Sequence, residues 1–279
     1  MDVSDPTLIM GLHGVFHRHP WIDRVLAEND LEDEDVFSLA VTRAEAYGWS
    51  STHLGRGTLD GCRWGHNDAG EDWTEDDRIR QLAWLQVAVE EHLHGQRLPF
   101  LPVATVLSDV LHHMGTYRFT GLHTVVPLQL STDDSLVYLS QAADWVAAAG
   151  PGPSAECVIT IAARESAGLA NKEQDVNALI LERSLGRMAI HPGKPSAPAV
   201  GLASLLVGEV QTEGMQKAAS IYCSLPAWSL DSAIWAAEVT ATAVREAGAR
   251  EPVLLTISQN GDELTQDVER DPALRERRC

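Results

Sequence analysis

Two segments far apart in the chain share one order of elements, and this order constrains the fold most. Residues 117–163 and 219–258 each contain an apolar strand, a helix and a second apolar strand. In both, a proline ends the first strand, an Asp-Ser pair begins the helix, the helix carries a tryptophan, and a glycine ends it. Residues 7–44 are a candidate third copy. We therefore predict an α+β or mixed α/β fold with repeated βαβ units and helices on the sheet faces. The alternative is chance similarity between two generic units.

Local patterns in the first 116 residues predict five further elements. Apolar runs indicate strands at 7–15 and 36–44. A proline in the first turn favours a helix over 20–29. A broad apolar face predicts a helix over about 77–94, and a terminal glycine supports another over about 103–114.

The length and texture of the chain suggest how these elements are divided. A chain of 279 residues suits one large domain or two small ones. We divide it into an N-terminal part, 1–116, which carries a loop rich in His and Trp at 47–75, and a duplicated part, 117–279. We expect the two parts to form one compact unit.

The charge of the chain excludes one large class of partner. The formal net charge is −19 and the isoelectric point about 4.8, so the phosphates of nucleic acids would be repelled. The N-terminus lacks the pattern of a signal peptide and no apolar run is long enough to span a membrane, so we expect a cytoplasmic protein. Its 18 Arg and 3 Lys, with many Ala, Val and Gly, are typical of a high-GC, actinobacterial composition.

The four cysteines indicate neither a zinc site nor a disulfide framework. Cys62, Cys157, Cys223 and Cys279 form no CxxC pair, and their spacing fits no known pattern. Cys157 and Cys223 lie in apolar runs and are interpreted as buried thiols. Cys62 lies in the loop at 47–75, where a pairing with a histidine is a further hypothesis.

The loop at 47–75 is the best candidate for a functional site. It holds six Gly, three Trp and two His, and no helical or strand period runs through it. Long loops inside compact domains are usually functional or disordered, and the tryptophans argue against disorder. Ten of the eleven histidines also lie within the first 123 residues. The alternative is a structural loop that its tryptophans anchor to the core.

The residue types of this loop suit acid–base chemistry on a small, anionic substrate. In this hypothesis a histidine moves a proton, a carboxylate orients or assists it, an arginine neutralises developing negative charge, and tryptophans wall the pocket. The predicted catalytic residues are His53, Asp60, His66 and Glu45, and the predicted substrate-binding residues are Trp49, Arg56 and Trp64.

Recognised cofactor and nucleophile motifs are missing from the sequence. It contains no GxSxG elbow, no phosphate-binding GxxxxGK[ST] loop and no GxGxxG after a strand, so we predict no cofactor. His13, His17 and His19 are the candidate metal ligands that lie close together in the sequence. They make a metal-dependent hydrolase a third hypothesis. Without HExxH or companion ligands at a recognised spacing, we predict no metal.

The combined pattern predicts a cofactor-independent acid–base enzyme acting on a small polar metabolite. A lyase, cyclase or isomerase of a bacterial specialised-metabolite pathway, which eliminates a group or closes a ring, fits best. The alternative is a non-catalytic ligand-binding protein or a scaffold subunit of a heteromeric enzyme, in which the loop tryptophans anchor an interface. Homo-oligomers and hetero-oligomers both remain open, with no nucleic acid or membrane as partner.

Overall fold

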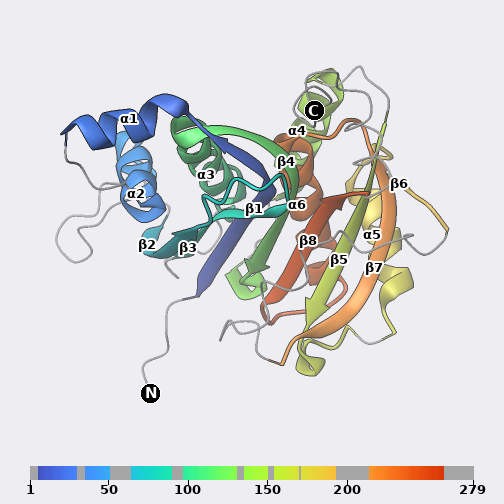
Figure 1. The fold of residues 1–279 in the computed structure, drawn as a ribbon. Coiled ribbons are helices and arrows are strands. Elements are labelled where there is room, and N and C mark those ends of the chain that lie inside the picture. Colours follow the sequence, from blue (N-terminus) through green and yellow to red (C-terminus); the bar gives the residue numbers. More distant parts are fainter. Residues whose placement is uncertain are drawn as a thin grey trace.

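A computed structural model of the chain gives an α+β fold built on one antiparallel sheet (Figure 1). Within the described part, the chain forms eight strands and six α-helices. The residues described are 6–29, 35–50, 64–89, 97–130, 135–149, 154–169, 171–192 and 214–260.

The eight strands lie in the order β2-β3-β1-β4-β8-β5-β7-β6, and every neighbouring pair is antiparallel. Their bounds are β1 (Thr7–Arg18), β2 (Gly65–Glu71), β3 (Arg80–Ala88), β4 (Gly115–Val126), β5 (Ala155–Ala163), β6 (Ala189–Ile190), β7 (Gln216–Leu225) and β8 (Val253–Gln259).

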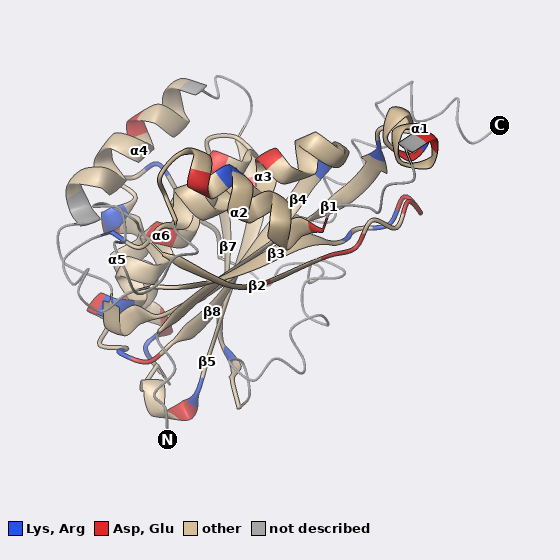
Figure 2. Cartoon of the chain, turned by 90° about the vertical axis from the view of Figure 1, so that its left-hand side faces the viewer, with Lys and Arg blue, Asp and Glu red and all other residues tan. Residues whose placement is uncertain are grey.

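The helices gather on one face of this sheet instead of covering both faces as predicted (Figures 1 and 2). Helix α6 lies against the middle strands β4 and β8, with α3, α4 and α5 around it. Helix α2 lies over β2 and β3. The bounds are α1 (Pro20–Asn29), α2 (Val36–Ala46), α3 (Phe100–Met114), α4 (Ser135–Ala149), α5 (Glu173–Arg183) and α6 (Leu230–Glu246).

The strand order divides the sheet into two halves with the same connectivity. Strands β1 to β4 lie in the order β2-β3-β1-β4, and β5 to β8 lie in the order β6-β7-β5-β8, which meets the first half at the β4–β8 pair. Each half follows a βαββαβ path, with α3 and α6 in corresponding places, and α4 connects the halves. This is the split-βαβ, or ferredoxin-like, arrangement.

The repeat predicted from the sequence differs from this correspondence. In the strand order, β7-α6-β8 takes the place that β3-α3-β4 takes in the first half, so 117–163 is not the counterpart of 219–258. The candidate third copy at 7–44 was wrong, because its second predicted strand is helical. The proposed division at residue 116 stays a prediction.

Two elements have the opposite type to the one predicted. Residues 36–44 were expected to be a strand but belong to α2, which begins after Asp35, whose side chain accepts a hydrogen bond from the Ser38 amide. Residues 77–94 were expected to be a helix but contain β3, which pairs with β1 and β2 on its two edges. Pairing on both edges overrides the helical propensity of this segment. The strand at 7–15 and the helices at 20–29 and 103–114 are confirmed.

The core lies between the sheet and the helices. Side chains alternate along the strands, so Val253, Leu255 and Ile257 of β8 face the helices. They pack in one buried cluster with residues of α3 and α6, including Trp235, which is 1% exposed. A much smaller cluster of Ile9, Val125 and Leu254 lies on the opposite face of the sheet.

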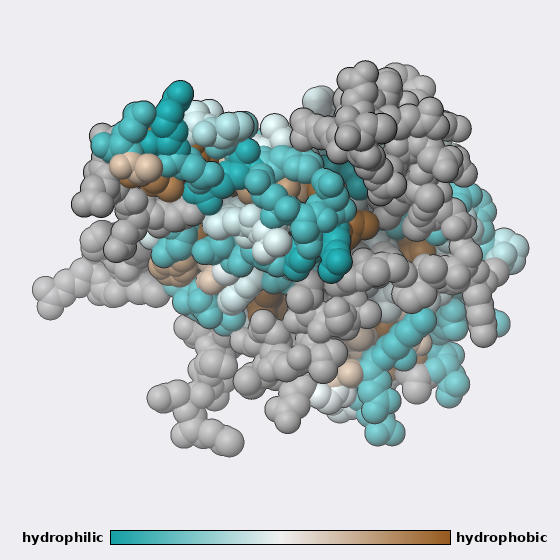
Figure 3. All heavy atoms as spheres, viewed as in Figure 1, coloured by the Kyte–Doolittle hydropathy of each residue, from teal (hydrophilic) through white to brown (hydrophobic). Residues whose placement is uncertain are grey.

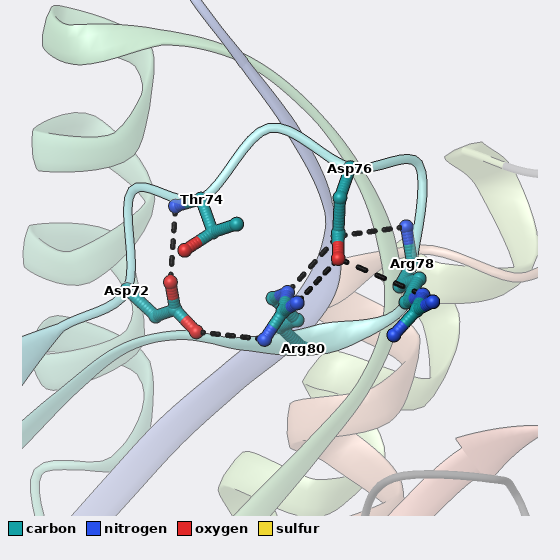
Figure 4. A network of polar contacts seen from close by, with 5 residues as sticks. All are labelled: Asp72, Thr74, Asp76, Arg78 and Arg80. Carbon is teal, nitrogen blue, oxygen red and sulfur yellow. Dashed lines mark hydrogen bonds and ion pairs between the residues drawn. The ribbon is translucent and has the colours of Figure 1, made fainter.

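A charged network fastens the hairpin between β2 and β3 (Figure 4). The Arg80 guanidinium donates hydrogen bonds to the carboxylates of Asp76 and, at 3.3 Å, Asp72. The Asp72 carboxylate also accepts a hydrogen bond from the Thr74 backbone amide. The hydrogen bond from Arg80 is the main reason that the pKa of Asp76 is lowered. These polar contacts therefore close the turn, beside the packing of the Trp73 ring on Phe16.

Hydrophilic residues cover much of the described surface on the face drawn in Figure 3. Figure 3 shows hydrophilic residues from α1 across the neighbouring surface, with hydrophobic residues in small separate patches. Lys and Arg are interspersed with Asp and Glu over the described elements (Figure 2). Among the helices of the described ranges, none is long and apolar enough to cross a membrane.

Candidate active site on the helix-free sheet face

Polar side chains line the face of the sheet opposite the described helices, which we call the helix-free face. One row crosses six adjacent strands at matched register. It consists of Trp84, Gly11, His123, Thr256, Thr160 and Ser220. A sheet face that only packed against apolar groups would carry Val, Ile and Leu at such positions. Hydroxyl and imidazole groups in the row instead offer hydrogen bonds to a polar ligand.

A carboxylate and a phenol form the centre of one cluster on this face. The Tyr222 hydroxyl of β7 donates a hydrogen bond to the Glu156 carboxylate of β5. The Asn260 amide, just after β8, donates to the same carboxylate oxygen, Oε2, at 3.2 Å. The Asn260 backbone N–H also donates to the Glu156 carbonyl at 3.0 Å. Three strands therefore fix the orientation of one carboxylate.

An imidazole extends this cluster towards the edge of the sheet. The rings of His191 and Tyr222 have centroids 5.3 Å apart. His191 Nε2 forms a short hydrogen bond with the Ser224 hydroxyl, and the His191 backbone amide donates to the Tyr222 carbonyl at 2.8 Å. The side chains of Glu156, Tyr222 and His191 are all partly exposed. A carboxylate, a phenol and an imidazole, all reachable, make a set of groups that can donate and accept protons.

A second cluster on the same face is a buried pair of histidines. His13 Nε2 of β1 and His123 Nδ1 of β4 are 2.7 Å apart, and the two side chains are 0% and 1% exposed. Burial lowers the pKa of His123 to about 4. Burial and then the neighbouring His123 lower the pKa of His13 well below its usual value. Both rings are therefore neutral near pH 7, and His13 Nδ1 has no hydrogen-bond partner within the described part.

Gly11 makes room for this pair. A Cβ atom at position 11 would lie 2.2 Å from His123 Cε1, which is far inside van der Waals contact. A second row of residues in register connects the two clusters. It crosses five strands and consists of His13, Gly121, Ser258, Val158 and Tyr222. Four strand spacings of about 4.8 Å place His13 and Tyr222 roughly 19 Å apart, whereas His123 on β4 and Glu156 on β5 are two spacings apart. They are distinct places on one face.

Four of the seven predicted site residues lie together, but on the other face of the sheet. Trp49 and Trp64 have ring centroids 6.5 Å apart, and His66 lies 6.3 Å from Trp64. His66 pairs in register with Val87, which faces the helices, and its ring contacts Phe37 of α2. Glu45 of α2 interacts electrostatically with His66. The other three predicted residues, His53, Arg56 and Asp60, lie outside the described residues.

The described contacts of this group are packing and hydrogen-bonding contacts, and its catalytic role stays a prediction. His66 Nε2 and the Ser50 hydroxyl are 2.7 Å apart, and Ser50 is 1% exposed. Burial lowers the pKa of His66 to about 4, although the charge of Glu45 opposes this. A single parallel bridge between Ser50 and Trp64 joins the two ends of the segment 51–63. These contacts hold α2 against the edge strand β2.

The three histidines predicted as metal ligands have different partners. His13 pairs with His123, His17 lies 3.8 Å from an oxygen of Asp77, and His19 stacks on Trp21. In the described ranges, no group of three or more His, Cys, Asp or Glu side chains is close enough together to hold a metal ion.

Sequence reasoning missed the cluster on β5, β7 and β8, although a signal was present. Polar residues occupy every second position in these segments, with Ser220, Tyr222 and Ser224 in β7 and Thr256 and Ser258 in β8. Such alternation indicates that one strand face is polar. We interpreted both segments by their apolar members alone. No protein-family model matches the chain, and comparisons with curated proteins and with solved structures find no significant similarity.

Proposed function

We propose that the protein is a cofactor-independent acid–base enzyme, of the lyase, cyclase or isomerase type, acting on a small polar metabolite at the Glu156–Tyr222 pair. One observation carries the proposal. A partly exposed carboxylate accepts hydrogen bonds from a phenol and an amide that come from two other strands. Preorganisation of this kind is typical of groups that transfer protons. The missing motifs for nucleotide binding support a reaction without such a cofactor.

The roles of the two groups follow from their functional groups. The Glu156 carboxylate is the base that takes a proton from a carbon or hydroxyl of the substrate. Tyr222, an O–H donor, stabilises the negative charge that develops on the substrate oxygen, and it can return a proton at the end of the reaction. Asn260 keeps the carboxylate in place while its protonation state changes. His191 supplies a second proton carrier beside the phenol.

The contrast between the clusters on the helix-free face supports this choice of site. His13 and His123 are almost fully buried, and their lowered pKa values make them weak bases near neutral pH. Glu156, Tyr222 and His191 are partly exposed, so a substrate can reach them. In the Ser50–His66 pair, Ser50 is buried and burial lowers the pKa of the partly exposed His66 to about 4, so this histidine is also a weak base near neutral pH.

The test needs no knowledge of the substrate. The protein is incubated with a small-molecule extract of actinobacterial cells in D2O, and the extract is followed by mass spectrometry. An enzyme that moves protons to and from carbon introduces solvent deuterium or produces a new mass. We expect a change that depends on the protein and is lost in Glu156→Gln and Tyr222→Phe.

As matched controls, the same two substitutions are made at a glutamate and a tyrosine outside the cluster. Glu182→Gln on α5 and Tyr138→Phe on α4 change exposed side chains in the helix layer, on the other side of the sheet from the cluster, and both should retain full turnover. Full turnover by both Glu156→Gln and Tyr222→Phe would refute the assignment of the active site to these two residues. An extract in which no metabolite changes would refute the proposal that the protein is an enzyme of this type.

Exposed aromatic groups on α4 favour one alternative, a non-catalytic scaffold subunit. Tyr138 and Trp145 are 48% and 62% exposed, and such residues are frequent anchors in protein interfaces. Native mass spectrometry of the protein purified from its own host distinguishes the two functions. A stoichiometric second chain supports the scaffold, whereas a bound small molecule supports the enzyme.

A further inference from the structure

Two cysteines face each other across strands β5 and β7. Cys157 and Cys223 are paired directly in the register of the two strands. Their Sγ atoms are 3.3 Å apart, and both residues are 0% exposed on the side of the sheet that carries the helices. Both carry thiol groups. Two sulfur atoms in direct contact at matched register are a different arrangement from two isolated buried thiols.

We propose that Cys157 and Cys223 form a reversible cross-strand disulfide when the protein meets a peroxide. Directly opposed residues of antiparallel strands have Cα atoms about 4.5 to 5.5 Å apart. This separation lies within the range of about 4.4 to 6.8 Å that disulfides span. Oxidation therefore requires only small movements of the side chains and no change of strand register.

The reaction is balanced with hydrogen peroxide as the oxidant. The thiolate of one cysteine attacks a peroxide oxygen, the O–O bond breaks, and a sulfenic acid and one water are formed. The second thiol attacks that sulfur, the S–OH bond breaks, and the S–S bond forms with release of a second water. Two electrons pass from the two sulfur atoms to the peroxide. A cellular thiol or dithiothreitol reverses the step by exchange.

The position of the pair links it to the Glu156–Tyr222 cluster. Glu156 precedes Cys157 on β5, and Tyr222 precedes Cys223 on β7, so the two pairs lie back to back on opposite faces of the same strands. An S–S bond of about 2.05 Å replaces a contact of 3.3 Å between the sulfur atoms, so small rotations of the two side chains add a covalent link between the strands that carry Glu156 and Tyr222. The effect on turnover rests on the proposed function, whereas the formation of the bond does not.

Burial determines how the reaction proceeds. Because both thiols are fully buried, a large oxidant must wait for β5 and β7 to separate locally. Hydrogen peroxide is small enough to need less opening. We therefore expect oxidation by peroxide to be faster than oxidation by glutathione disulfide at equal concentration.

The experiment follows the two thiols by mass in the full-length protein. Cys62→Ser and Cys279→Ser remove the other cysteines, and the wild-type chain is treated in parallel. After exposure to hydrogen peroxide, the protein is denatured in N-ethylmaleimide and digested without reductant. We expect both thiols to disappear together, with a mass loss of about 2 Da, a linked peptide pair that contains Cys157 and Cys223, and full recovery with dithiothreitol.

A matched variant and a contrary outcome complete the test. Cys157→Ser, in the same background, keeps the Cys223 thiol and should show no loss of about 2 Da. Circular dichroism checks that this variant is folded, and the mapping of the wild-type chain does not depend on it. Complete alkylation of both cysteines after peroxide treatment, or oxidation that stops at separate sulfinic acids, would overturn the proposal. Failure of the D2O turnover assay would leave this mass result unchanged, so the two proposals fail separately.

Discussion

Arg97 holds the carboxylate of Glu238 at two points across the interior of the helix layer. Its Nε donates to Glu238 Oε1 at 2.9 Å, and its Nη2 donates to Oε2. Glu238 is only 6% exposed in the middle of α6, and burial raises its pKa although the charge of Arg97 opposes this. The segment before α3 is thereby tied to the helix that covers the centre of the sheet.

Removing the arginine should destabilise the fold strongly. Arg97→Met leaves a buried carboxylate without its charged partner, which costs about 3 kcal/mol of unfolding free energy. Urea unfolding at pH 7 measures the loss. Arg97→Met combined with Glu238→Leu removes both charges and should recover most of it. A double variant as unstable as the single one would show that the ion pair is not the cause.

The same variant should show a pH dependence of known sign. The pKa of Glu238 is higher in the folded protein than in the unfolded chain. Below the pKa of the unfolded chain, Glu238 is protonated in both states and costs no stability. As the pH rises through the folded pKa, the buried carboxylate ionises and the free energy of unfolding decreases. Loss of Arg97 raises that pKa further. The difference in stability between Arg97→Met and wild type should therefore be smaller at pH 4 than at pH 7, by urea unfolding at both values.

The buried histidines should make the protein sensitive to acid. The pKa of His123 is about 4 in the folded protein against 6.5 as its ordinary value. Between these values the unfolded chain binds a proton that the folded chain does not, so stability falls as the pH falls through this window. For His123 the difference corresponds to about 3 kcal/mol, since one pKa unit is about 1.4 kcal/mol.

Denaturant unfolding at pH 7.5 and pH 5 measures the part of this loss that falls in that interval, about 2 kcal/mol for His123. A double variant, His13→Gln with His123→Gln, should lose less stability than wild type over the same range. His113→Gln, on an exposed residue near the end of α3, is the matched control and should behave as wild type. An equal loss in the double variant would assign the acid sensitivity to other groups.

A methyl group at position 11 should be tolerated only if His123 is removed. In Gly11→Ala the new Cβ would lie 2.2 Å from His123 Cε1, and overpacking of this kind costs about 1–3 kcal/mol. Gly11→Ala with His123→Ala should show a favourable coupling in a double-mutant cycle. Gly14→Ala is the control, because its Cβ meets the Arg118 carbonyl at 2.1 Å, which His123→Ala does not relieve. Thermal unfolding of the five variants gives the cycle.

The Ser50–His66 pair should contribute to stability and not to turnover. Ser50→Ala removes the hydroxyl partner of the His66 Nε2, which costs about 1 kcal/mol. Urea unfolding measures this change, and the D2O assay should give the turnover of wild type. Loss of turnover with unchanged stability would move the active site from the helix-free face to the segment around α2.

Local patterns predicted the elements that have one consistent signal. The helix at 20–29 begins with a proline, and the strand at 253–259 is apolar and bounded by polar residues, so the sequence was sufficient for both. The segments at 36–44 and 77–94 carry apolar residues that fit either period. In α2 the buried residues Val36, Ala40 and Ala44 repeat every fourth position, and this helical spacing was outweighed by an apparent strand pattern.

The candidate site was harder to predict because it depends on contacts between distant strands. Glu156 and Tyr222 are 66 positions apart, and only the β5–β7 register brings them together. Concentrations of His and Trp drew the prediction to the N-terminal half. Of those residues, Trp64 and His66 prove to be packed beneath α2, where aromatic rings fill a core as readily as they wall a pocket.

The pairing of β4 with β8 joins the two halves of the sheet within one chain. In an isolated half, β4 or β8 would be an unprotected edge strand, able to pair with the same strand of a second copy. Two identical halves joined in this way would form a sheet with the same strand order, but every side chain would occur twice. Because one chain supplies both halves, each can differ from the other. One half carries a buried, neutral imidazole pair and the other a partly exposed carboxylate and phenol, so the two halves present unlike chemistry on the same face of one sheet.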